Sequence, residues 1–380
     1  MIVRHFLQWV RNAPAGARAE AISALARAYI HSELSSDDRA AVEGAMILVL
    51  DDPSPLARLA LAEAVAGSED APPAIILALA ADQPEIAAVI LARSPLLLDA
   101  DLVDSVGSGN SAIQAAIAGR EWLPCAVAAA IAEVASAEAC LVLVENEDAV
   151  IAPFSLDRIV ERHGHLAAIR EALLPREDLP VSTRQALIAK LSDTLAGFVT
   201  ARQWMEEKRA RRVAHEACDK ATVAIAGESE GPNVRPLVKH LRITGQLTAG
   251  LVLRALLSGN MLLFEEALAE LSELPLTRIA GLVYDGNGTG LRALCERAGL
   301  PETVYLAARV ALQTIRESGY MGEGGGATRL KRRIVERVLT CCDGQERTAE
   351  TQALLVLLRR FALEAARDEA RLFCDELAAA

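Results

Sequence analysis

Aromatic residues are scarce in this sequence, and their scarcity limits the choice of fold. Phe, Trp and Tyr make up 3% of the 380 residues, although hydrophobic residues as a whole make up 52%. The apolar content is therefore mainly Ala, Leu, Val and Ile. Sheet proteins are richer in aromatic residues and Thr, whereas Ala and Leu are strong helix formers. The composition favours an all-α chain, long enough for two or three modules.

Long apolar runs are also lacking. The longest, such as Trp122–Ala132, are about eleven residues, and a membrane span needs about 18 or more. The first 21 residues have neither a long apolar segment nor a clear signal-peptide cleavage site. Seven cysteines without disulfide-framework spacing are typical of reduced thiols. We therefore expect a cytoplasmic protein with no membrane partner.

Motifs that indicate catalysis are missing too. The sequence has no Gly-x-Ser-x-Gly elbow and no Cys motif paired with a nearby His. Two short groups offer metal-ligand residue types, but neither has a standard zinc spacing. They are the segment His163–His165 and the set His215, Cys218 and Asp219 on one helix face. We read both as structural and expect no catalytic residue, no metal and no cofactor.

Two glycine-rich segments lack the context that phosphate binding requires. Gly286–Gly290 precedes a predicted helix, but no predicted strand comes before it. A dinucleotide-binding fingerprint directly follows a strand. Gly322–Gly326 is not followed by the Lys-Ser/Thr pair of a phosphate loop. We interpret the first as a turn and the second as a flexible loop. For the second, contact with an anion or a phosphoprotein stays an alternative.

The net charge is −12 and is unevenly spread. Residues 1–199 hold 14 Lys/Arg against 27 Asp/Glu, whereas residues 200–242 hold nine against six. An acidic first half would repel a phosphate backbone, and no aromatic residues alternate with the basic ones for base stacking. We therefore expect no nucleic-acid partner.

One predicted helix, Thr328–Cys341, is strongly basic, with Arg329, Lys331, Arg332 and Arg333 close together. Arg332 and Glu336 are spaced as an i,i+4 ion pair. The cluster is interpreted as a solvated helix face. The alternative is a docking site for an acidic partner.

Helix-period apolar patterns run from Ala19 to about Ala226 and are broken every ten to fifteen residues by turn signals. Helices that short cannot bury a face alone and must stack on their neighbours. The pattern therefore predicts a HEAT-like α-solenoid of short helix pairs, followed by a related C-terminal helical module.

Internal repetition supports the solenoid. Arg93, Arg120 and Asn146 end similar apolar segments 27 and then 26 residues apart, so they occupy equivalent turn positions. Such side chains can bond the last carbonyls of a helix and face its negative pole. The alternative is a ladder of polar groups along a binding face. Further on, Leu256–Pro275 and Leu282–Pro301 repeat with an offset of 26.

Breaks between these patterns predict three domains, at residues 1–228, 229–320 and 321–380. The first ends in one long polar helix, about Leu187–Ala226, and Gly227–Pro236 is interpreted as a linker or turn. The third holds the glycine-rich loop, the basic helix and a long final helix, about Thr348–Leu377. The final helix carries an apolar stripe that either docks on the chain's own body or pairs with a second subunit: Leu354, Leu358, Phe361, Ala365 and Leu372.

Short motifs at matching spacing give the chain a family resemblance over roughly Ala45–Val310. The sequence resembles an uncharacterised bacterial family, a domain of unknown function, of HEAT-like helical-repeat proteins. The resemblance implies a fold and no activity. It is carried by Val89–Pro95, Asp101–Val103, Ala116–Arg120, Val144–Asn146, Leu253–Asn260, Phe264–Ala269 and Ala298–Pro301.

The function expected from these features is non-catalytic protein binding or scaffolding, in bacterial signalling or regulation. A protein partner is expected, and a homodimer through the final helix is an option. One alternative is a sensor of a small ligand or second messenger. A weaker one is an enzyme on a HEAT-like scaffold, such as a DNA glycosylase. The expected partner-binding residues are Arg93, Arg120, Asn146, Arg329, Lys331, Arg332 and Arg333.

Overall fold

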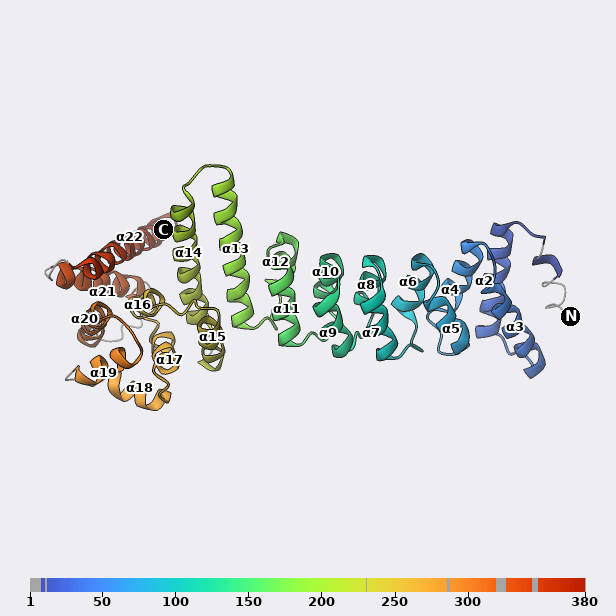
Figure 1. Ribbon diagram of the computed structural model, residues 1–380, viewed down its shortest axis with the longest axis horizontal. Helices are drawn as coiled ribbons and strands as arrows, with labels where there is room; N and C mark the ends of the chain where they lie inside the picture. The colour runs from blue at the N-terminus through green and yellow to red at the C-terminus, as the bar shows by residue number, and fades with distance from the viewer. Residues whose placement is uncertain are drawn as a thin grey trace. The chain divides into compact units, whose positions relative to one another are not determined.

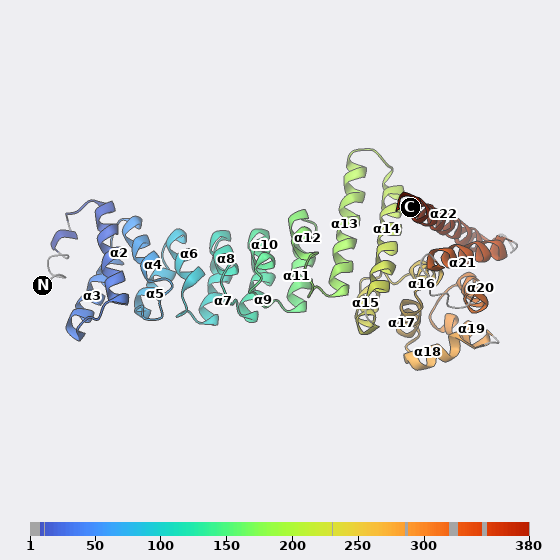
Figure 2. The same cartoon turned by 180° about the vertical axis from the view of Figure 1, so that it is seen from behind.

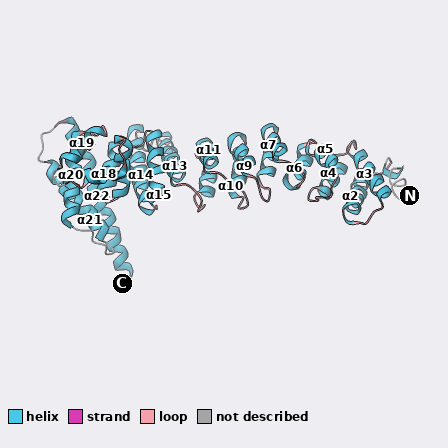
Figure 3. Ribbon diagram, turned by 90° about the horizontal axis from the view of Figure 1, so that it is seen from below, coloured by secondary structure: helices cyan, strands magenta, loops and turns pink. Residues whose placement is uncertain are grey.

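The computed structural model describes residues 8–10, 12–229, 231–285, 288–318, 326–343 and 348–379. Every regular element in these ranges is a helix (Figure 3), so the predicted all-α fold is confirmed. The chain divides into two compact units, Met1–Leu179 and Pro180–Ala380. The sequence instead places boundaries after residues 228 and 320.

The first unit is an array of short helices in two rows (Figures 1 and 2). In one row α2, α4, α6, α8, α10 and α12 each contact the next member, and α7, α9 and α11 do so in the other. The array has the stacking expected of paired helical repeats. Its helices are α2 (Ala15–His31), α3 (Ser36–Val49), α4 (Pro55–Val65), α5 (Pro73–Ala80), α6 (Pro84–Arg93), α7 (Asp99–Ser108), α8 (Ser111–Ala118), α9 (Cys125–Val134), α10 (Ala137–Glu145), α11 (Pro153–His163) and α12 (Ala167–Leu173).

Local sequence explains where these helices begin. Proline is the first residue of α4, α5, α6 and α11, where its missing N–H costs nothing. Side-chain oxygens of Ser35, Asn110 and Ser136 accept hydrogen bonds from backbone N–H groups at the starts of α3, α8 and α10. The buried faces are small and aliphatic, as in α6, where Ile86 and Ile90 are fully buried.

A recurring polar contact joins neighbouring repeats between α6 and the segment after α12. Arg120, just after α8, donates hydrogen bonds to Leu91 O and Ser94 O at the end of α6. Asn146, just after α10, does the same to Ala118 O and Arg120 O. Further along, Arg162 caps the end of α9 and Arg176 the end of α10. These side chains satisfy carbonyls that a helix end leaves without a partner.

The second unit packs around one central helix. Every residue of α16 from Leu251 to Leu257 is buried, and the hydrophobic core around it draws on α14 through α22. A helix buried all round is typical of the middle of a larger domain. The helices are α13 (Val181–Ala201), α14 (Glu207–Glu228), α15 (Gly231–Ile243), α16 (Ala249–Leu257), α17 (Met261–Ser272), α18 (Leu276–Val283), α19 (Thr289–Arg297), α20 (Glu302–Ser318), α21 (Gly326–Asp343) and α22 (Ala349–Ala379).

The prediction of a single long helix over about Leu187–Ala226 is wrong. The structure has an antiparallel hairpin of α13 and α14, with a turn over residues 202–206. Gln203 adopts a φ of 56°, and the Trp204 ring packs edge-on against Phe198 at 5.6 Å between centroids. The turn uses neither Gly nor Pro, so it carries none of the usual signals.

The segment Gly227–Pro236, expected to be a linker or turn, is mostly helical, so an extended linker there is wrong. Helix α14 continues to Glu228, and Pro236 lies inside α15. Val223, Ala226 and Val234 belong to the core of the second unit. Their burial joins the hairpin to the helices that follow it, which is why the units divide before α13.

The final helix lies close to its predicted bounds and contributes to the core. Leu354, Leu358, Phe361 and Ala365 of α22 are buried against the second unit's own helices. The fifth residue of the predicted stripe, Leu372, is exposed. Most of the stripe therefore serves packing within the chain.

Candidate functional site

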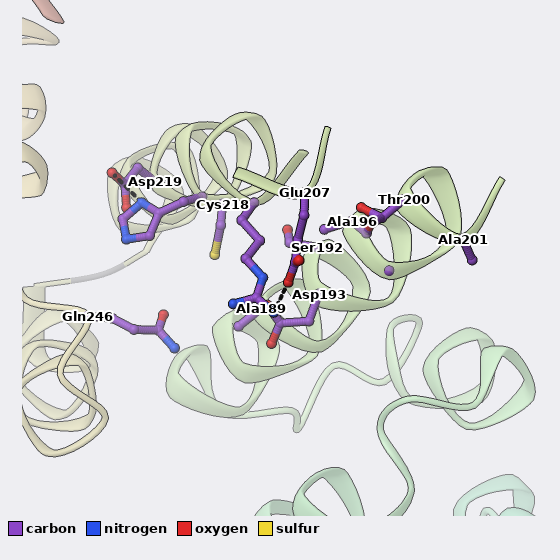
Figure 4. A pocket seen from close by; sticks show the side chains of 13 residues that line it. Ala189, Ser192, Asp193, Ala196, Thr200, Ala201, Glu207, Cys218, Asp219 and Gln246 are labelled. Atoms are coloured by element: carbon purple, nitrogen blue, oxygen red, sulfur yellow. Dashed lines mark hydrogen bonds and ion pairs between the residues drawn. The ribbon is translucent and has the colours of Figure 1, made fainter. Parts of the chain in front are cut away.

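The α13–α14 hairpin of the second unit carries a large pocket. An open groove of about 790 Å³ runs along it and ends near Gln246, after α15. Its walls differ: α13 contributes mostly small side chains, and α14 contributes charged ones (Figure 4). The lining residues are Ala189, Ser192, Asp193, Ala196, Gly197, Thr200, Ala201, Glu207, Arg211, His215, Cys218, Asp219 and Gln246.

The charged wall of the groove follows from helical spacing. Glu207, Arg211, His215 and Asp219 succeed one another at intervals of four residues and share one face of α14. Arg211 Nη2 lies 2.5 Å from Glu207 Oε1, and His215 Nδ1 lies 3.3 Å from Asp219 Oδ2. The hydrogen bond to Asp219 raises the pKa of His215. The wall is polar and largely paired within itself.

Cys218 lies in the same groove but lacks the environment of a nucleophile. Burial raises the pKa of its thiol above the usual value, and the nearby Asp219 carboxylate adds to the effect. A catalytic cysteine needs the opposite shift. His215 is bonded to Asp219. This Cys, His and Asp set therefore lacks an activated thiol.

A buried amide lies next to Gln246, one of the residues that line the groove. Gln185 of α13 is 0% exposed, and its Nε2 donates to Gln246 Oε1 at 2.6 Å. Its Nε2 also lies 3.8 Å from Cys218 Sγ. Its own Oε1 is buried without a hydrogen-bond partner in the described part of the chain. An acceptor left unpaired in this way has unused capacity for one donor.

The outer end of the hairpin is apolar and basic. Phe198 and Trp204 are exposed, Trp204 by 69%, and Arg202 stacks over the Phe198 ring at 5.2 Å. The start of α14 carries an exposed basic run, Lys208–Arg212, which includes Arg211 of the groove wall. The sequence indicates the basic excess over residues 200–242 but not the groove, because the turn that forms the hairpin carries no recognisable signal.

The three turn positions predicted as partner-binding residues have different environments. Arg120 and Asn146 bond carbonyls of the preceding repeat, as described above. Arg93 is exposed at the end of α6. The capping contact expected from the sequence is therefore present at two of the three positions. A role in partner binding stays a prediction for all three.

The basic cluster of α21 is brought against α22. Lys331 Nζ lies 3.3 Å from Asp368 Oδ2, and Arg332 pairs with both Glu336, at 2.7 Å, and Glu369, at 2.6 Å. Arg333 is exposed. The side chain of Arg329 lies outside the described residues. Two of the four predicted residues thus hold the final helix in place.

The remaining candidates from the sequence are the possible metal ligands and the two glycine-rich segments. No group of three His, Cys, Asp or Glu side chains in the described ranges is placed to hold a metal ion. Gly286, Asn287 and most of the segment Gly322–Gly326 lie outside those ranges. Over the same residues, no helix has the length and hydropathy of a membrane span.

Comparison with known proteins places the chain in a family. Residues 86–348 match the family described as "Uncharacterised protein conserved in bacteria (DUF2336)". The match runs from within α6 past the end of α21, so it includes the hairpin and most of the second unit. No curated protein and no solved structure matches the chain. The chain belongs to this uncharacterised bacterial family, as its sequence motifs indicate.

Proposed function

We propose that this protein is a non-catalytic, cytoplasmic interaction protein that binds a helical segment of a partner protein in the α13–α14 groove. We expect its setting to be bacterial signalling or regulation. The observation that carries the proposal is the groove itself, open along one side of the hairpin and lined by small side chains. Seven free cysteines, three of them exposed, support a reducing compartment.

The dimensions of the groove suit a helix. Its α13 wall extends from Ala189 to Ala201, which is about 18 Å at 1.5 Å per residue. Small residues such as Ala196 and Gly197 let a third helix approach closely and insert larger side chains between them. Helix-in-groove binding uses this arrangement in many regulatory complexes.

The groove itself is lined by three carboxylates, Asp193, Glu207 and Asp219, against one cation, Arg211, and the basic residues that would attract an acidic partner flank it at the start of α14. Arg211 lines the groove, and the adjacent Lys208, Arg209 and Arg212 are exposed on the same turns of α14. Opposite charge speeds association and selects orientation more than it adds affinity. We therefore expect a partner helix with one apolar face and acidic flanks.

One substitution separates binding from folding. A Cβ atom added at Gly197 would meet no atom within 4 Å, so Gly197→Leu starts a larger side chain in open space on the α13 wall of the groove. Removing a glycine from a helix interior also stabilises the helix by roughly 0.5–1 kcal/mol. Gly44 in α3 has the same open surroundings, so Gly44→Leu is the matched control.

The test is affinity purification from a native bacterial extract with tagged full-length protein. A defined partner should co-purify in stoichiometric amount with the wild type and Gly44→Leu, and should be lost with Gly197→Leu. Thermal unfolding of the three proteins checks that all are folded. Equal recovery with Gly197→Leu would refute the groove as the binding site.

Homodimerisation through α22, the other partner expected from the sequence, has less surface to use. Four residues of its apolar stripe are buried in the second unit, which leaves Leu372, Phe373 and Leu377 exposed near the end of the helix. We keep this dimer as a secondary proposal. It predicts that the wild type has the molecular mass of a dimer in solution and that Leu372→Glu has the mass of a monomer.

A further inference from the structure

A second pocket, separate from the hairpin groove, lies where the final helix crosses the core of the second unit. Its volume is about 530 Å³, within the range of small-molecule sites. The lining combines cations with small and apolar groups from α14, α16, α17, α21 and α22. It consists of Lys220, Val223, Ala224, Gly227, Arg254, Ser258, Gly259, Asn260, Met261, Leu262, Lys331 and Glu364.

Three cations from three helices converge on one carboxylate in this pocket. Glu364 of α22 accepts from Arg254 Nη1 at 2.8 Å, and it lies 3.3 Å from Lys220 Nζ and 3.9 Å from Lys331 Nζ. Asp368, one turn later, also contacts both lysines. Three positive charges therefore surround the position of a single Glu364 carboxylate.

Arg254 is an unusual residue for its place in the fold. It is 5% exposed and is the one charged residue in the fully buried stretch Leu251–Leu257. Its guanidinium lies 4.3 Å from the centre of the Phe361 ring. Its Nε is buried without a hydrogen-bond partner in the described part of the chain. Burying a cation costs several kcal/mol unless its donors are used, so this arginine is incompletely satisfied.

The charges of the pocket do not balance. Lys220, Arg254 and Lys331 supply three positive charges against two negative ones from Glu364 and Asp368. The excess stands out in a chain whose net charge is −12. A phosphate group carries more charge than a carboxylate and has three oxygens for hydrogen bonds. It would match three convergent cations better than Glu364 does.

We propose that this pocket binds the phosphate group of a small phosphorylated ligand, and that the Glu364 carboxylate occupies the phosphate position when the ligand is absent. Arg254, Lys220 and Lys331 would hold the phosphate. The side chains of Val223, Met261 and Leu262 would contact the body of the ligand. This inference is independent of partner binding in the hairpin groove.

Exchange of Glu364 for a ligand needs only a side-chain movement. The Glu364 side chain is 21% exposed, so it can turn toward solvent while Phe361 and Ala365 keep α22 packed in the core. The ligand would then compete with an internal anion, which lowers its apparent affinity. Removing that anion should strengthen binding.

The competition gives a test with inorganic phosphate as the probe. Full-length wild type, Glu364→Gln and Glu364→Gln/Lys331→Gln are titrated with phosphate at constant ionic strength, and the unfolding temperature is followed. We expect Glu364→Gln to half-saturate at a phosphate concentration at least tenfold lower than the wild type. Adding Lys331→Gln should abolish the gain.

Glu336→Gln is the matched control, because Glu336 pairs with Arg332 on α21 and does not line the pocket. Its phosphate response should equal that of the wild type. Should Glu364→Gln fail to fold, the wild type is compared with Lys331→Gln alone, which should lose the saturable response. The proposal is overturned if the unfolding temperature of neither the wild type nor Glu364→Gln responds to phosphate in a saturable way. It is also overturned if all variants respond equally.

Discussion

Replacing Arg120 by methionine should weaken the junction between two neighbouring repeats. The guanidinium donates to Leu91 O at 2.5 Å and to Ser94 O at 2.8 Å, and both acceptor residues are buried. Methionine keeps most of the aliphatic stem but supplies no donor. Each hydrogen bond to a charged group contributes about 1.5–3 kcal/mol, and the desolvation cost of the arginine offsets part of it.

The expected net loss for Arg120→Met is about 3 kcal/mol of local stability. Burial lowers the pKa of Arg120 below the ordinary arginine value, which reflects the same desolvation cost, and the charge of Asp99 opposes the shift. Arg120→Lys should lose less local stability than Arg120→Met, because an ammonium group retains the charge and can donate to one carbonyl. It should still be less stable than the wild type, because it lacks the planar fork that reaches two carbonyls.

Hydrogen exchange read by mass spectrometry is the appropriate assay, because a chain of two units does not unfold as one cooperative step. Amides of α6 and α8 that exchange by opening of this junction should exchange on the order of a hundred times faster in Arg120→Met. Protection in the second unit should be unchanged.

Arg93→Met is the matched control for this experiment. Arg93 occupies the equivalent sequence position one repeat earlier but is exposed, so its replacement should change stability by less than about 0.5 kcal/mol. If both substitutions have the same effect, or if Arg120→Met leaves α6 and α8 as protected as before, the capping contact is not what stabilises the junction.

Two further predictions concern titratable groups of the second unit. The hydrogen bond to Asp219 raises the pKa of His215 above 6.5, so the pair contributes stability below pH 6.5 that disappears as pH rises through the folded-state pKa. Asp219→Asn should therefore cost about 0.3–0.5 kcal/mol at pH 6 and nothing at pH 9 in the urea transition of the second unit, since His215 is 53% exposed; an equal cost at both pH values would contradict the assignment. Burial raises the pKa of Cys295 to about 11, so iodoacetamide at pH 8 should label the exposed Cys341 at least 100-fold faster than Cys295 in the native protein and equally in denaturant, whereas similar native rates would show that Cys295 is accessible.

The first unit could be predicted well because its contacts are local and periodic. The 27- and 26-residue spacing of Arg93, Arg120 and Asn146 reflects the stacking of α6, α8 and α10. Proline and capping residues fixed the helix starts. The exposure of Arg93 was not predictable, since it depends on packing that the repeat pattern does not encode.

The candidate sites of the second unit depend on contacts that are distant in sequence. The groove lies along a hairpin whose turn includes Gln203 at a positive φ, a conformation that its residue type does not indicate. Arg254 meets Glu364, which lies 110 residues later. A lone arginine in an apolar helix is the one signal that could have pointed to this pocket.

The side-chain contacts to helix-end carbonyls described above run in one direction along α6 to α12. Arg120, Asn146, Arg162 and Arg176 each donate to a carbonyl 26–32 residues earlier in the chain. During synthesis, each repeat therefore leaves the ribosome with uncapped carbonyls and is completed only when the next repeat emerges. A stall in translation within this region would leave the last finished repeat incomplete, so quality-control proteases should attack the nascent chain at its most recent repeat.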